Sequence, residues 1–151
     1  MARRTLPDLV CLYCKQVMPD KNRRNTYCGS VCQHKYIHES YIERWKLGEE
    51  VGYGGANNQL SAHIKKYLIE RRGCSCWKCG WAEVHPTTKK VPLQWNHIDG
   101  DSTNCRESNL ELICPNCHSL TPNFGALNKG KSTRTNRRTG SLVDRHVANV
   151  N

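Results

Sequence analysis

Apolar positions along the chain predict two amphipathic helices. The first is expected to begin near Ser30, a suitable N-cap, and its apolar residues recur at helical spacing: Tyr36, Ile37, Tyr41, Ile42 and Trp45. The second is expected over about residues 58–72 and is followed by Gly73, a residue type that commonly ends helices. Its apolar face consists of Leu60, Ile64, Tyr67 and Leu68. The intervening residues 47–57 contain four glycines and few large apolar groups, which is typical of a linker.

The second half of the chain predicts two short strands and a short helix. Residues 91–98 and 110–113 have the apolar content of strands, and a polar loop separates them. Pro115 fits the first turn of a helix that would carry Cys117 and His118. The predicted order is therefore strand, loop, strand and helix.

Ten cysteines among the 151 residues change this picture. The hydrophobic fraction is 37% with the cysteines included, so stapling by metal or disulfides is expected in place of one large apolar core. Eight of them form four short pairs: Cys11 and Cys14, Cys28 and Cys32, Cys76 and Cys79, and Cys114 and Cys117. Such spacing presents both sulfurs of a pair to one ion, and four sulfurs satisfy tetrahedral Zn²⁺. The first two pairs are therefore predicted to form one structural zinc site and the last two a second.

Redox activity and disulfides are the alternative explanations for these pairs. A redox Cys-x2-Cys motif usually stands alone after a strand in a βαβ pattern, and no such pattern is visible. The first residues lack the apolar segment of a secretion signal, so the protein is expected in a reducing cytoplasm, where paired cysteines more often bind metal. Cys74 could replace Cys76 as a ligand, but Cys76 has the two-residue spacing. Cys105 is expected to be a passive loop thiol.

The charge balance indicates a polyanionic partner. Lys and Arg number 23 against 13 Asp and Glu, a formal net charge of +10, and two zinc–thiolate sites would leave about +6. Nucleic acid is the usual partner of such a chain, although a generic basic protein has the same composition. Candidate DNA-binding residues lie on the second helix and in the basic tail: Lys65, Lys66, Arg71, Arg72, Lys129 and Lys131. A solvated helix face is the alternative for the first four. No run of about 18 apolar residues is present, so no membrane partner is expected.

Residues 93–129 carry the candidate chemistry, at His97, Asn109 and His118. The segments W-N-H-I-D-G, S-N-L and C-P-N-C-H closely resemble the HNH endonucleases of the ββα-metal class. The chain looks most like their zinc-stapled form, common in bacteriophages and mobile introns. The following S-L-T-P-N-F-G-A-L-N-K-G also resembles phage members, and the resemblance covers about residues 75–130. The first knuckle, residues 11–32, is similar to treble-clef zinc fingers found ahead of some phage HNH domains.

The resemblance implies roles for four residues. His97 would be the general base that activates water, and Asn109 would hold the loop between the strands and so orient His97. His118 would bind the catalytic divalent metal, with Asn96 as the second ligand. Many relatives have Asp or His at the position of Asn96, and an amide oxygen binds Mg²⁺ more weakly than a carboxylate. The catalytic metal is therefore expected to be Mg²⁺ or Mn²⁺, with Co²⁺ or Ni²⁺ as alternatives. Asp99 or Asp101 could add a carboxylate near the metal, although turn formation is the commoner reason for such residues.

Together these features predict a small α+β zinc-stabilised protein. Its expected parts are an N-terminal treble-clef-like zinc module with a helix (1–47), a Gly-rich linker (48–57), a ββα-metal HNH nuclease domain with the second zinc site (58–130), and a basic flexible tail (131–151).

The expected function is that of a metal-dependent DNA endonuclease, a phosphodiester hydrolase acting as a phage homing or nicking enzyme in the host cytoplasm. The alternative is a non-catalytic zinc-finger DNA-binding regulator, which would bind DNA without cutting it in any metal. No heptad repeat or long apolar stripe indicates a dimer interface, so a monomer is favoured. The charge and the motif are also compatible with RNA.

Overall fold

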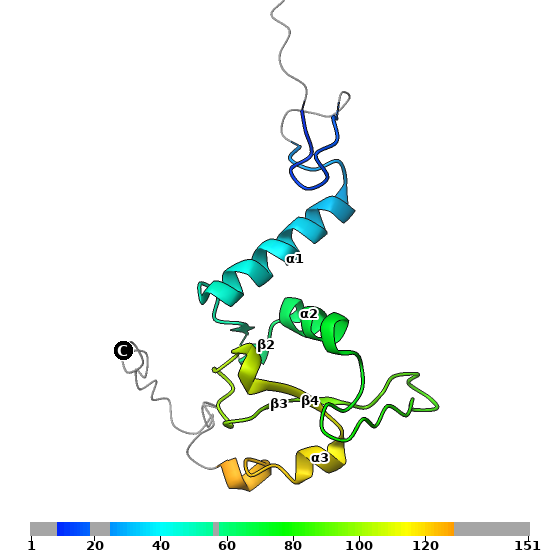
Figure 1. The fold of residues 1–151 in the computed structure, drawn as a ribbon, viewed down its shortest axis with the longest axis vertical. Coiled ribbons are helices and arrows are strands. Elements are labelled where there is room, and N and C mark those ends of the chain that lie inside the picture. Colours follow the sequence, from blue (N-terminus) through cyan, green and yellow to red (C-terminus); the bar gives the residue numbers. More distant parts are fainter. Residues whose placement is uncertain (1–8, 19–24, 56–57, 129–151) are drawn as a thin grey trace, which may run out of the picture. The chain divides into compact units, whose positions relative to one another are not determined.

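The computed structural model describes residues 9–18, 25–55 and 58–128. The chain divides into two compact units, Met1–Glu50 and Val51–Asn151, and each is described by itself. The elements follow in the order α1 (Ser30–Leu47), β1 (Tyr53–Gly54), β2 (Gln59–Leu60), α2 (Ala62–Arg72), β3 (Gln94–His97), η1 (Glu107–Asn109), β4 (Leu110–Ile113), α3 (Pro115–Ser119) and η2 (Gly125–Asn128). Figure 1 labels α1, β2, α2, β3, β4 and α3. Within the described residues, no helix combines the length and the apolar character that crossing a membrane requires.

The first unit consists of a cysteine knuckle followed by α1. In the knuckle, Val10 and Val17 form an antiparallel bridge. The N-cap of α1 is Gly29, whose backbone is extended and which offers no side-chain hydrogen bond. The predicted N-cap at Ser30 is therefore wrong by one residue, because Gly29 is still extended and Ser30 is already helical.

The second unit begins with a two-stranded hairpin at the place where the sequence predicted the start of a helix. β1, within the Gly-rich segment, pairs antiparallel with β2. Leu60 is buried in this hairpin, although its position matches the helical spacing of the residues that follow. Helix α2 begins at Ala62, later than predicted, because Ser61 caps it by accepting a hydrogen bond from the His63 N–H (3.3 Å). It ends before Gly73, as predicted.

The antiparallel pair of β3 and β4 forms the centre of the second unit. In its register Asn96 lies opposite Glu111 and His97 opposite Leu110. β4 has the predicted bounds, whereas β3 is shorter than the predicted strand over 91–98. Pro92 has no N–H to donate to a ladder, which favours a later start. Helix α3 packs against β3 (Figure 1).

The second cysteine knuckle is part of the core of this unit. Ile113, Cys76 and Cys114 are buried together, and the partly buried residues packed against them are Trp81, Leu93 and Cys117. The Trp77 N–H donates to the Leu112 carbonyl (2.9 Å), so the knuckle is also hydrogen-bonded to β4. The side chain of Cys114 caps α3, which begins at Pro115 as predicted.

The segment after α3 folds back onto the turn that follows β3. The Asn123 side chain donates to the Ile98 carbonyl (2.7 Å), and the Asn128 side chain donates to the Gly100 carbonyl (2.9 Å). Gly100 has a φ of 80°, and a Cβ there would lie 2.9 Å from the Cγ of Asn123. A larger residue would not fit, so glycine allows the close approach that holds the chain just beyond His97.

Candidate active site and metal centres

The eight paired cysteines gather into the two clusters that their spacing predicted. In each cluster all four sulfurs lie within 4.8 Å of one another; the clusters are Cys11, Cys14, Cys28 and Cys32, and Cys76, Cys79, Cys114 and Cys117. The sulfurs of Cys14 and Cys28 are 3.7 Å apart, and those of Cys79 and Cys114 are 3.8 Å apart. Tetrahedral zinc with bonds of roughly 2.3 Å needs a separation of about 3.8 Å. Both clusters could therefore hold a structural Zn²⁺ ion.

The thiol pKa values also favour a cation in each cluster. Burial raises the pKa of Cys11, but backbone hydrogen bonds, the first from Cys14, outweigh it and lower the pKa to about 6. In the same way, burial raises the pKa of Cys76, and backbone hydrogen bonds lower it to about 6. A hydrogen bond with Cys28 raises the pKa of Cys32 to about 12. One thiolate thus makes its neighbours hard to ionise, and four thiolates together need a divalent cation.

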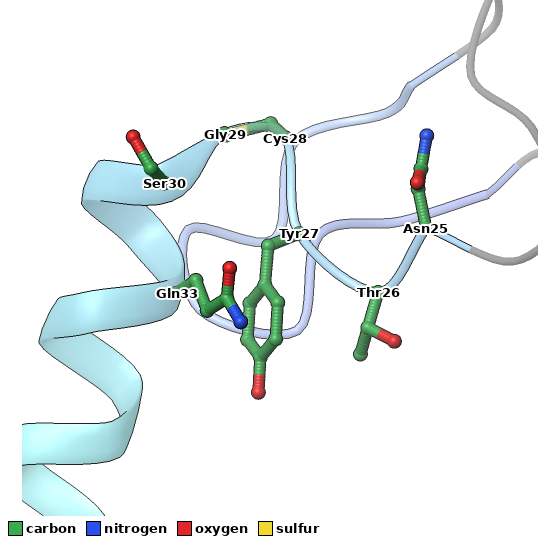
Figure 2. Close-up of a pocket in the computed structure, with 7 residues that line it drawn as sticks. All are labelled: Asn25, Thr26, Tyr27, Cys28, Gly29, Ser30 and Gln33. Atoms are coloured by element: carbon green, nitrogen blue, oxygen red, sulfur yellow. The ribbon is translucent and has the colours of Figure 1, made fainter.

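A polar pocket lies where the first knuckle runs into α1. Figure 2 shows its lining residues: Asn25, Thr26, Tyr27, Cys28, Gly29, Ser30 and Gln33. The ring of Tyr27 lies 5.6 Å from the ring of Tyr36 on α1. Of the residues predicted to carry the chemistry of either centre, the pocket contains the zinc-ligand candidate Cys28 and none of the catalytic candidates.

His97 is the last residue of β3 and is half-buried. Burial lowers the pKa of His97, and the charges of Asp99 and Asp101 oppose that shift only in part. The imidazole is therefore uncharged at neutral pH, which is the form that a general base needs.

Cys105 contacts the His97 ring, a contact that the sequence analysis missed. Its buried Sγ lies 3.8 Å from Nε2 of His97. Burial raises the pKa of Cys105 to about 11, so the group stays a thiol. The thiol donates to the Ser102 carbonyl (3.7 Å), which leaves the sulfur lone pairs to accept from an N–H at Nε2. His97 would then keep the lone pair of Nδ1.

Asn109 is buried and ties both ends of the loop after β3 together. Its Nδ2 donates to the Asp99 carboxylate (2.9 Å) and to the Asn104 carbonyl (2.8 Å), and its Oδ1 accepts from the Asp99 N–H (3.0 Å). Its own carbonyl accepts from the Ile98 N–H (2.9 Å). Asp99 also accepts from the Asp101 N–H (2.8 Å), so its contacts favour the turn-forming role over a role near the metal.

His118 lies on α3 and faces β3. Its Nδ1 is hydrogen-bonded to Oε1 of Gln94, and its ring packs edge-on against Phe124, with centroids 5.3 Å apart. An amide oxygen only accepts, so Nδ1 carries the hydrogen and Nε2 keeps the lone pair that a metal would use. Gln94 was not predicted as a site residue. Its position two residues before Asn96, on the same face of the strand, is the signal that could have found it.

Asn96 is buried, with 7% of its surface exposed, on the same face of β3 as Gln94. Its Nδ2 donates to Oε1 of Glu111 on β4 (2.7 Å), and Lys78 Nζ lies 3.2 Å from the same oxygen. Among the hydrogen bonds of the described residues, none reaches Asn96 Oδ1. Glu111 was also missed, because the partner of Asn96 depends on the strand register.

The two histidines make different side-chain contacts around β3. His118 contacts Gln94. His97 contacts Cys105, and its position in the strand places its side chain on the face opposite to that of Gln94. Among the described residues, no hydrogen bond or ring contact joins His97 to His118. Asn96 Oδ1 offers an oxygen donor and His118 Nε2 a nitrogen donor. Such a set fits a divalent cation whose other ligands are water or phosphate.

Several basic residues proposed to meet DNA already contact other side chains. These contacts pair Lys66 with Glu70 (3.8 Å), Arg71 with Glu107 (2.8 Å) and Arg72 with the Trp77 ring (3.8 Å to the centroid). Lys65 lies on the same helix, and Lys129 and Lys131 lie outside the described residues. The exposed ion pairs of α2 are weak and leave these cations accessible to a phosphate.

Comparison with known proteins found a phage protein of similar sequence. The chain is 34% identical over 99 residues to the H-N-H endonuclease F-TflIV of Escherichia phage T5. This chain is related to an HNH endonuclease. The match covers 62% of the chain and 40% of the relative, so the chain spans less than half of that relative's length. No family model and no solved structure matches the chain.

Proposed function

We propose that this protein is a metal-dependent DNA endonuclease that hydrolyses phosphodiester bonds. The observation that carries the proposal is the placement of two histidines at one strand: His97 ends β3, and His118 contacts Gln94 of β3 from α3. The similarity to an HNH endonuclease supports the same reading. Binding alone requires no such pair of imidazoles.

His97 is the proposed general base. Its lowered pKa keeps the ring uncharged at neutral pH, and the contact with Cys105 favours a hydrogen on Nε2. Nδ1 is then the atom that takes the proton from the attacking water. Asn109 is the proposed positioning residue, because its hydrogen bonds fix Ile98 and Asp99, which directly follow His97.

Asn96 Oδ1 and His118 Nε2 are the proposed ligands of the catalytic metal. A divalent cation bound there would stabilise charge on the scissile phosphate and the leaving oxygen. Gln94 would hold the His118 tautomer, and Phe124 would hold its ring plane. The two cysteine clusters are the proposed structural zinc sites. The basic residues of α2 are proposed to contact the phosphate backbone of DNA, which would position the DNA without reading its sequence.

Cleavage of supercoiled plasmid tests the proposal directly. Wild-type protein should nick DNA with Mg²⁺ or Mn²⁺ but not with EDTA, and His97→Ala should lower the rate at least about 100-fold. His34→Ala, an exposed histidine of α1, is the matched control and should retain the wild-type rate. DNA binding without cleavage in any metal would instead favour a non-catalytic zinc-finger DNA-binding protein.

The pH profile of cleavage tests the role of His97 as a base. A base must be unprotonated, so the rate should fall as the pH drops through the pKa of His97. Because burial lowers that pKa, the acid limb should have its midpoint below about 6.5, the ordinary imidazole value. Zinc content must be measured at each pH, since acid also protonates the thiolates. With zinc retained, a midpoint above that value would contradict the assignment.

A further inference from the structure

We propose that Glu111 is a positioning residue that turns the Asn96 amide so that its oxygen faces the catalytic cation. This inference rests on the proposed function, because it concerns the same metal site. The register of β3 and β4 places the two residues directly opposite each other, and Asn96 Nδ2 lies 2.7 Å from Glu111 Oε1.

The chemistry of the two groups fixes the direction of the amide. A carboxylate accepts hydrogen bonds and donates none, so Asn96 must present its nitrogen to Glu111. Its oxygen then points away from Glu111. The two ends of an amide have nearly the same shape, and without a charged neighbour either end could face the cation. Only the oxygen can bind a divalent metal ion.

The surroundings of Glu111 make it a fixed partner. Its side chain is 13% exposed, and Lys78 Nζ lies 3.2 Å from the oxygen that accepts from Asn96. Burial strengthens a hydrogen bond to a charged acceptor, and the lysine offsets the cost of burying the carboxylate. Lys78 lies between Cys76 and Cys79, so the chain Lys78–Glu111–Asn96 connects the second cysteine cluster to the proposed metal ligand.

This arrangement also gives a physical reason for an asparagine at position 96. An aspartate there would place a second carboxylate 2.7 Å from the position of the Glu111 oxygen, where like charges repel. Glu111 thus favours a neutral ligand at this position and makes that ligand present the correct atom.

Mn²⁺ binding to the zinc-loaded full chain, measured by EPR without DNA, tests the inference in a double-mutant cycle. Glu111→Gln should weaken Mn²⁺ binding about tenfold, since a glutamine can face the Asn96 amide either way. In the Asn96→Asp background, Glu111→Gln should not weaken Mn²⁺ binding, because both carboxylate oxygens can bind metal and the substitution removes the repulsion between the two carboxylates. Glu83→Gln, an exposed glutamate, is the charge-matched control and should bind Mn²⁺ like the wild type.

Equal weakening in both backgrounds would overturn the inference, because it would mean that Glu111 acts through its charge or as a ligand itself. Unchanged binding in Glu111→Gln would also overturn it. If the wild type cuts plasmid while Glu111→Gln binds Mn²⁺ normally, the inference fails and the proposed function stands. If the wild type neither binds Mn²⁺ nor cuts, both fail.

NMR of the wild-type protein gives a measurement that does not depend on the folding of a variant. An Asn96 Nδ2 hydrogen held by a buried carboxylate should resonate downfield and exchange slowly with water. The side-chain amide of exposed Asn116 is the internal reference. Asn96 signals like those of Asn116 would show that the hydrogen bond to Glu111 is absent and would overturn the inference.

Discussion

In both units a Cys-x2-Cys knuckle meets a second cysteine pair at the start of a helix, which is α1 in the first unit and α3 in the second. The leading cysteine of each cluster, Cys11 or Cys76, is buried, and backbone hydrogen bonds lower its pKa to about 6 against the effect of burial. The two clusters therefore share one local design. They differ in what else their residues contact.

The second cluster is joined to the proposed active site by contacts within its own unit. In the second knuckle Lys78 forms an ion pair with Glu111, and His118 directly follows Cys117. In the first knuckle the Tyr13 hydroxyl donates to Glu39 of α1 (2.7 Å), which is an exposed contact within the same unit. The comparison shows the same cysteine arrangement beside an exposed tyrosine–glutamate contact in one unit and beside residues of the proposed active site in the other.

Loss of the second cluster should have the largest effect. Cys114→Ser removes a ligand that is also part of the core and the cap of α3. Structural zinc contributes about 10 kcal/mol or more to folding of small metal-stapled domains, so we expect loss of one of two zinc ions and at least 100-fold slower cleavage, roughly. Zinc content and plasmid nicking measure this outcome. Near-normal cleavage with one zinc ion would break the proposed connection between cluster and active site.

Loss of the first cluster should separate folding from catalysis. Cys28→Ser should also reduce the zinc content from two ions to one, but cleavage at saturating DNA should stay within about threefold of wild type, because the proposed catalytic residues all belong to the second unit. Kinetics over a range of DNA concentrations would show little change in kcat. A kcat as low as that of Cys114→Ser would mean that the two clusters contribute equally to the cleavage rate.

Loss of the Lys78–Glu111 ion pair should have a smaller effect on Mn²⁺ binding and cleavage. Lys78→Met leaves the largely buried Glu111 carboxylate without its cation, and a loss of about 1 kcal/mol corresponds to roughly fivefold weaker Mn²⁺ binding and slower cleavage. Lys90→Met is the control, because this exposed lysine should tolerate the change. Identical results for the two variants would remove the link between the knuckle and the metal site.

Loss of the Tyr13 hydroxyl should have the smallest effect on stability and cleavage. Tyr13→Phe removes an exposed hydrogen bond to Glu39, so thermal unfolding should shift by a few degrees at most, and cleavage should not change. Calorimetry and plasmid nicking on the same preparation check both expectations. A cleavage defect larger than that of Lys78→Met would mean that the first knuckle contributes more to cleavage than the second.

The sequence by itself determined the features that depend on short spacing. The four cysteine pairs, the helix starting at Pro115 and the end of α2 at Gly73 are encoded within a few residues, and the structure contains them. The positions of His97, Asn109 and His118 in a strand–loop–strand–helix order were likewise readable, because each element has its own local pattern. The start of α2 was misplaced because Leu60 fits helical spacing and strand pairing equally well.

Only the tertiary structure decided which side chains face one another at the proposed active site. The contacts of Asn96 with Glu111 and of Gln94 with His118 join residues 15 and 24 positions apart, and that of Cys105 with His97 spans 8. Each depends on the strand register or on how a loop or helix packs against β3. A shift of the register by one residue would move every side chain of the strand to the other face, and the register is fixed by which face the folded unit buries.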